Sequence, residues 1–139
     1  MKQHNEHTTE KQTSGLGDKR RTKWFWMYNE IPDEYAPILG PCGIAIYVAL
    51  SRHANADTRD CFPSYRTLAR KAGCSPAMAV KAVKLLCECN IISKTTRTNP
   101  DTGRPTSNMY LLLDRTDWRP VSELKHLLRK NHKRKKDEN

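Results

Sequence analysis

The chain has 139 residues and carries 25 Lys and Arg against 15 Asp and Glu, a formal net charge of +10. This length gives room for one domain and excludes two domains with separate hydrophobic cores. The excess of basic residues favours a polyanionic partner, because Lys and Arg release counterions that are condensed on nucleic acid. The alternative is that the basic segments only increase solubility. We find neither an apolar signal segment nor an apolar stretch long enough to cross a bilayer, so we expect a cytoplasmic protein without a membrane partner.

The positive charge is concentrated in three segments. Residues 1–23 hold six Lys and Arg against three Asp and Glu, and residues 125–139 hold seven against two. Between them, residues 59–104 hold nine basic residues against three acidic ones. We therefore expect the basic face of the folded domain to lie on this middle segment.

The number of cysteines is odd, which favours free thiols in a reducing compartment. They are Cys42, Cys61, Cys74, Cys87 and Cys89. Cys87 and Cys89 are the only close pair, and on a helix they point about 200° away from each other. No second pair completes a zinc site, so we expect no metal. We also expect no other cofactor and no small-molecule ligand. Buried or half-buried thiols are the expected alternative.

The N-terminal residues 1–23 are expected to form a disordered basic tail. Residues 1–18 contain almost no apolar side chains and cannot offset the entropy cost of folding. The aromatic run Trp24–Tyr28 then predicts a short strand or a cap over the core. Stacking on exposed bases is the alternative, but packing is favoured because the domain has few other large apolar groups.

A first core helix is predicted after a turn-rich stretch from Asn29 to Gly40. Pro41 suits the first turn of a helix, where its missing N–H is not needed. The dense apolar residues that follow indicate a helix that is buried on most sides and ends near His53 or Ala54. Residues 55–61 are polar and predict a loop.

Two further helices are predicted directly after one another. Ser64 is a suitable N-cap for the first, and Gly73 can take the left-handed conformation that ends it. Ser75 and Pro76 then start a second helix, which continues to about Cys89. Two helices joined by a turn of about three or four residues cross at a large angle, so this segment predicts a helix-turn-helix.

The second of these helices has two faces. The inward residues have helical spacing and are Ala79, Ala82, Val83, Leu86 and Cys89. The outward residues are Ala77, Lys81, Lys84 and Glu88. The small Ala77 lets the backbone approach a groove closely, and Met78 suits a thymine methyl group. Lys81 suits a base edge or a phosphate and Lys84 a phosphate, while a solvated helix face is the alternative for each of these residues.

A β-hairpin is predicted after this helix. Asn90 is a candidate helix stop, and the β-branched residues of 91–97 indicate a strand. Residues 98–105 have strong turn chemistry, and residues 108–113 indicate the return strand. The basic side chains on the hairpin or beside its loop are Lys94, Arg97 and Arg104. Such an arm can follow the adjacent DNA backbone or enter a minor groove.

A last helix is predicted from Val121, with Ser122 as a candidate N-cap. Its apolar residues at helical spacing are Leu124, Leu127 and Leu128. A basic end follows at residues 129–136. The helix could pack on the domain, pair two protomers or fold only on DNA, and the sequence does not choose among these.

Together these elements predict a mainly α fold with a small β-hairpin. The motifs that carry a family resemblance are Phe62–Ala69, Gly73–Ser75, Asn90–Ile92 and Ser107–Tyr110. In this order they resemble the winged helix-turn-helix family, which has a three-helix core plus a wing. They are most similar to the DNA-binding domains of replication initiators and accessory proteins of phages, plasmids and other mobile elements. The run from Leu39 to Leu50 is similar to the first helix of that group and extends the match to residues 28–113. We expect the domain to span 24–120, between the basic tail and a C-terminal helix with a basic tail at 121–139.

The resemblance implies binding of double-stranded DNA, with the second helix in the major groove and other residues on flanking phosphates. The residues to which it assigns DNA binding are Ser64, Arg66, Ser75, Ala77, Met78, Lys81, Lys84, Lys94, Arg97 and Arg104. Family members usually have basic or polar side chains in the first turn of this helix, whereas this chain has Pro76 and Ala77. We therefore expect position to be set by backbone contacts and sequence by few bases.

The expected function is replication initiation or its control on a mobile element, in a bacterial, nucleoid-associated protein. A transcriptional regulator is the first alternative, and a protein-interaction module without DNA binding is the second. A homodimer or a partner in the replication machinery is left open. We expect no enzyme, because no paired carboxylates, Gly-rich phosphate loop or nucleophile motif accompanies the five His residues.

Overall fold

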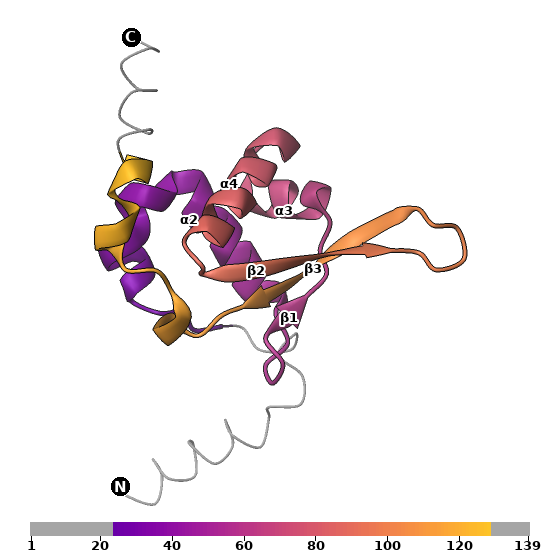
Figure 1. Ribbon diagram of the computed structural model, residues 1–139, viewed down its shortest axis with the longest axis horizontal. Helices are drawn as coiled ribbons and strands as arrows, with labels where there is room; N and C mark the ends of the chain where they lie inside the picture. The colour runs from indigo at the N-terminus through magenta and orange to yellow at the C-terminus, as the bar shows by residue number, and fades with distance from the viewer. Residues whose placement is uncertain (1–23, 129–139) are drawn as a thin grey trace, which may run out of the picture.

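The computed structural model describes residues 24–128 as three helices packed against a small antiparallel sheet (Figure 1). The mainly α winged helix-turn-helix fold expected from the sequence is confirmed. The predictions for the tail at 1–23 and for the basic end after Leu128 lie outside the described residues.

The first helix begins ten residues earlier than the sequence indicates. It comprises η2 (Ile31–Tyr35) and α2 (Ala36–His53), which run together with a kink at Gly40, where φ is 68° and ψ is 175°. The interpretation of Asn29–Gly40 as turn-rich is therefore wrong. Its prolines are tolerated in the first turn of each helical segment, and four of its apolar side chains have helical spacing and are buried: Ile31, Tyr35, Ile38 and Leu39. Pro41 does start a helical segment, because the kink at Gly40 precedes it.

This early start also corrects the expectation about membrane-length stretches. The helical run Ile31–His53 has 23 residues and is apolar enough to cross a bilayer by length and composition. Half of its most apolar window is buried inside the domain. A core helix passes the same test, and Ile46 and Leu50 of this run are part of the hydrophobic core.

The two helices of the helix-turn-helix form as predicted. α3 spans Tyr65–Ala72, and the Ser64 hydroxyl accepts a hydrogen bond from the Thr67 N–H at its start. Gly73 ends α3 in the left-handed conformation, with φ 74° and ψ 34°. α4 spans Pro76–Glu88, and the Ser75 hydroxyl accepts a hydrogen bond from the Met78 N–H. The cap at each helix start and the stop at Gly73 are confirmed.

The sheet has three strands in the order β1-β3-β2. β2 (Ile92–Thr98) and β3 (Pro105–Leu112) form the predicted hairpin, which Asn90 precedes with a positive φ of 57°. Their register shifts between Thr95 and Arg97, which marks a bulge. β1 (Asp60–Cys61) was not predicted, because two residues carry no periodicity and the strand exists only through its pairing with β3.

The aromatic run at 24–28 forms no strand, and only its last two residues, Met27 and Tyr28, pack against the core, whereas Trp24 and Trp26 are exposed. Tyr28 is half-buried, and its ring lies edge-on to that of Trp118, with 5.2 Å between centroids. Trp118 also contacts the rings of Tyr35 and Tyr47, and its indole N–H donates to the Leu113 carbonyl. This cluster attaches the segment after β3 to α2.

The C-terminal residues that the structure describes pack on the domain. η4 (Val121–Leu124) is a 3-10 helix, and helical structure continues to Leu128. Leu124 and Leu127 are buried in the core. Of the three roles left open for this helix, packing on the domain therefore applies to these residues. Ser122 is not the N-cap, because it lies inside η4, whose start has no side-chain capping bond.

Gly40 is predicted to be the position in the first helix where the backbone conformation least tolerates another residue. Its φ and ψ lie in a region that only glycine readily occupies, and an added Cβ would meet no atom within 4 Å. Gly40→Ala should therefore lower the free energy of unfolding by about 1–3 kcal/mol through backbone strain alone. Urea unfolding measures this change.

The matched comparison substitutes asparagine for Gly40 and for Gly73. Gly73 is in the left-handed helical region, which asparagine tolerates, so Gly73→Asn should cost less than about 1 kcal/mol. Gly40→Asn should cost as much as Gly40→Ala. Equal tolerance of asparagine at both positions would contradict the assigned backbone conformation of Gly40.

Candidate nucleic-acid interface

The outer face of α4 presents one continuous exposed patch. Ala77, Val80, Lys81 and Lys84 are all exposed and are spaced three or four residues apart. Residues at these spacings are neighbours on a helix surface. The inward residues Ala79, Ala82, Val83 and Leu86 are buried, as predicted. We call the four exposed residues the α4 patch.

Val80 was missing from the residues that the sequence singled out. Its side chain is 43% exposed. A surface valine has no distinctive sequence signal, because helical periodicity places it only at the border of the polar face. Val80 belongs to the patch because the opposite face of α4 packs against the core and leaves this side chain at the surface.

Met78 lies on a different flank of α4 from Val80. The two residues are about 160° apart around the helix axis, and Met78 is also exposed, at 45%. The Cys42 thiol of α2 donates a hydrogen bond to the Met78 carbonyl at 3.8 Å. The Met78 end of α4 is therefore tied to α2.

α4 is in contact with β2 of the hairpin. Cys87 is two helical turns after Val80 on the same flank. Burial raises the pKa of the Cys87 thiol, and the nearby Lys94 ammonium on β2 partly offsets this rise. Lys94 is exposed and lies near Cys87, about 10 Å along the helix axis from Val80.

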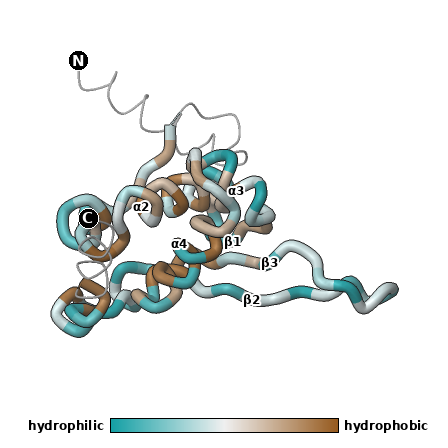
Figure 2. Tube along the Cα trace, turned by 90° about the horizontal axis from the view of Figure 1, so that it is seen from above, coloured by the Kyte–Doolittle hydropathy of each residue, from teal (hydrophilic) through white to brown (hydrophobic). Residues whose placement is uncertain are grey.

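The β2–β3 hairpin forms an arm that extends away from the helices (Figure 1). Figure 2 shows that the arm is coloured mostly teal to white, whereas α2 and α4 include brown, hydrophobic stretches. The turn is closed by a hydrogen bond from the Asn99 N–H to the Arg104 carbonyl at 2.8 Å, and Gly103 has a φ of 69°. Arg104 is exposed next to this turn.

Arg97 is held by two contacts within the protein. Its Nε donates to the Ser107 carbonyl at 2.8 Å, across the hairpin. Its guanidinium carbon lies 4.5 Å from the centroid of the Phe62 ring, a cation–π contact. Phe62 precedes the N-cap of α3 by two residues, so this stack joins the arm to the start of the helix-turn-helix.

The remaining predicted site residues lie at the starts of the two helices. The Ser64 hydroxyl is engaged as the α3 cap and with the Thr67 hydroxyl at 3.0 Å. Ser75 is the α4 cap and is exposed. Arg66 is exposed in the first turn of α3.

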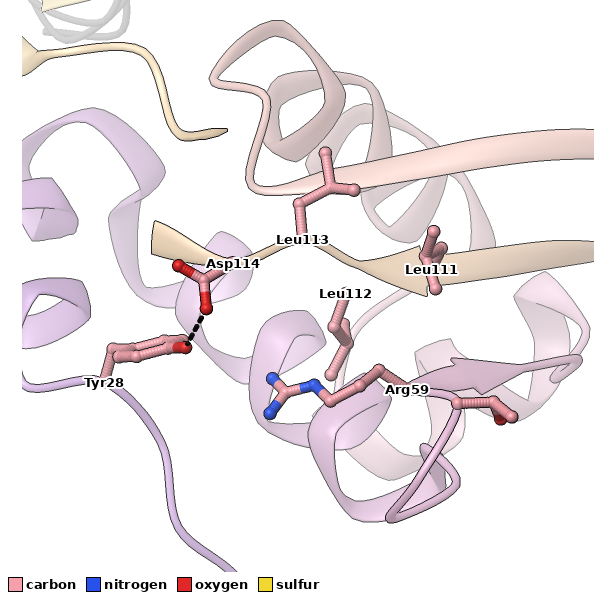
Figure 3. Close-up of a pocket in the computed structure, with 7 residues that line it drawn as sticks. Tyr28, Arg59, Leu111, Leu112, Leu113 and Asp114 are labelled. Atoms are coloured by element: carbon pink, nitrogen blue, oxygen red, sulfur yellow. Dashed lines mark hydrogen bonds between the residues drawn. The ribbon is translucent and has the colours of Figure 1, made fainter. Parts of the chain in front are cut away.

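A second surface feature is a cavity of about 280 Å³ beside the N-terminal segment, shown in Figure 3. The Tyr28 hydroxyl donates to the Asp114 carboxylate there at 3.1 Å. Backbone and side-chain hydrogen bonds from Thr116 hold the pKa of Asp114 below its ordinary value. Arg59 lines the cavity and lies 4.8 Å from the Trp26 ring, so its charge is not part of the α4 patch. Within residues 24–128, no group of three or more His, Cys, Asp or Glu side chains could hold a metal ion.

A comparison with families of known proteins supports the helix-turn-helix of this region. Residues 41–92 match the model of a family described as a helix-turn-helix domain, from the second part of α2 to the first residue of β2. Among solved structures, the chain is similar to a "Possible transcriptional regulator" from Methanosarcina mazei Go1, with 12% sequence identity and a TM-score of 0.46. The match covers 84% of this chain and 92% of that one. A search of curated proteins gives no match.

We predict that the Phe62 ring limits the motion of the arm. An exposed cation–π contact contributes about 0.5–1 kcal/mol, so Phe62→Ala should lower the melting temperature by only a few degrees. Backbone amide exchange in the outer part of β2 and β3 should become several times faster, while exchange in α2 stays unchanged. Hydrogen exchange read by NMR measures both.

The control is Phe62→Trp, which keeps an aromatic face for Arg97 and should retain the slow exchange. Unchanged exchange in Phe62→Ala would show that the hairpin hydrogen bonds alone hold the arm.

Proposed function

We propose that this protein binds double-stranded DNA, with α4 in the major groove and the arm on the flanking backbone. The observation that carries the proposal is the α4 patch, which joins a helix face of small and basic side chains to a basic arm. A helix N-terminus with small residues can approach base edges closely. The opposite face of α4 is buried, so only the patch side is available to a groove.

The phosphate contacts are assigned to basic residues around the patch. Lys81 and Lys84 project from α4, and Lys94 is exposed on β2. Arg66 and Arg104 are exposed at the start of α3 and at the turn of the arm. Arg97 contributes by orienting the arm and by its charge. These contacts set position, because phosphates carry no sequence information directly.

The role that we propose for DNA binding is replication initiation or its control on a mobile element, which rests on the resemblance of the sequence motifs. Regulation of transcription requires the same surface. Footprinting over the neighbouring genomic region distinguishes the replication role from the transcriptional role. Repeated sites indicate an origin, and a single palindrome at a promoter indicates a repressor.

The main rival is a protein-interaction module that uses the same face without DNA. Such a module has no measurable affinity for duplex DNA even at low salt, where nonspecific electrostatic binding is strongest. Titration of a fluorescent random-sequence duplex at about 20 mM salt tests this directly.

Charge reversal on the α4 patch should abolish most of the duplex affinity. Lys81→Glu combined with Lys84→Glu removes two cations that face the backbone, which should weaken binding on the order of 50-fold at about 0.1 M salt. The control is Lys125→Glu, an exposed lysine after η4 whose reversal should change the affinity only slightly. Equal effects of reversal at both places would refute the placement of α4.

Removal of residues 129–139 should reduce the salt dependence of binding. The segment contains six Lys and Arg against two acidic residues, and each phosphate contact that is lost should lower the slope of log affinity against log salt by about 0.9. The deletion has to begin after Leu128, because Leu127 is buried in the core. Selection of bound duplexes should return the same preferred sequences, and a changed preference would contradict a role limited to phosphates.

A further inference from the structure

The side chains of α4 leave only a few ways to distinguish bases. Between Pro76 and Glu88 the helix contains no Arg, Asn, Gln, Ser or Thr. It therefore cannot make the two-point hydrogen bonds by which Arg recognises guanine and Asn or Gln recognises adenine. After Pro76, the side chains that remain exposed are Lys81 and Lys84, which can contact guanine or phosphates, and the apolar Ala77, Met78 and Val80.

The apolar half of the α4 patch lies at the end of the helix that enters a groove first. Ala77 is in the first turn, and Val80 is its neighbour about 60° away around the axis. Both side chains are exposed. Lys84 follows Val80 by one helical turn and Lys81 follows Ala77 by one turn, so both lysines border the apolar pair. A duplex that contacts these lysines therefore also covers Val80.

The major groove offers one apolar group that depends on the base. This group is the C5 methyl of thymine, and contact with it is the means by which aliphatic side chains distinguish thymine from cytosine. Burying an exposed valine against such a methyl removes apolar surface from water on both partners.

We propose that Val80, together with Ala77, contacts thymine methyl groups and so gives this protein a preference for sites with thymine at the positions under the first half of α4. The inference rests on the proposed DNA binding. It differs from the sequence-based expectation, which assigned a methyl contact to Met78. We favour Val80 because it is a surface neighbour of both Ala77 and Lys84, at spacings of three and four residues, whereas Met78 has such a spacing within the patch only to Lys81.

The test replaces thymine by uracil, which lacks only the C5 methyl. The full-length chain is first used to select bound sequences from a random duplex library. The best duplex is then prepared with thymine or with uracil throughout, and both affinities are measured at one salt concentration. For the wild type, each methyl contact that is lost should weaken binding roughly four-fold.

Two variants locate the contact. Val80→Ala should bind the thymine duplex more weakly and show a thymine-to-uracil affinity ratio roughly four-fold smaller than the wild type, since only the Ala77 contact remains. Met78→Ala, whatever its own affinity, should keep the wild-type ratio. Both changes are at exposed positions, so circular dichroism should show an unchanged fold. General effects of uracil on DNA stiffness are the same for all three proteins and cancel in the comparison.

The outcomes separate this inference from the function on which it rests. Tight binding with equal affinity for both duplexes, or a selected site without thymine, overturns the methyl contact and leaves DNA binding in place. A ratio that keeps its wild-type value in Val80→Ala and falls in Met78→Ala also overturns it. No binding to either duplex overturns the proposed function itself.

Discussion

The turn between α3 and α4 determines what the rest of this molecule can do. Gly73 reverses the chain in a left-handed conformation, and the Ser75 hydroxyl restarts the helix by accepting from the Met78 N–H. A cap of this kind contributes about 1 kcal/mol and fixes where the helix begins. A shift of one residue in that start would rotate α4 by about 100° and bury its lysines. The geometry of one short turn therefore selects which face meets solvent.

Two contacts between distant segments support this arrangement. The aromatic cluster around Trp118 attaches the chain after β3 to α2, and α2 in turn packs against α4. The stack of Arg97 on Phe62 links the arm to the start of α3. The two surfaces that a duplex would touch are thus connected through packed side chains rather than through the flexible arm alone.

Much of the helix-turn-helix is predictable because its signals are local. The caps at Ser64 and Ser75 bond to backbone groups three residues away, and Gly73 acts on its own backbone. The inward face of α4 follows from a repeat of three and four residues. The same local signals are misleading before Pro41, where prolines and Gly40 suggest turns although the chain is helical.

The sequence by itself determined the helix starts, the stop at Gly73, the hairpin and the buried side of α4, because each depends on residues within a few positions of one another. Only the tertiary structure decided that β1 is a strand, that the side chain of Val80 stays exposed and that Phe62 holds Arg97. These features depend on partners far along the chain, and which partner a residue meets is fixed by packing of the whole core rather than by local conformational preference.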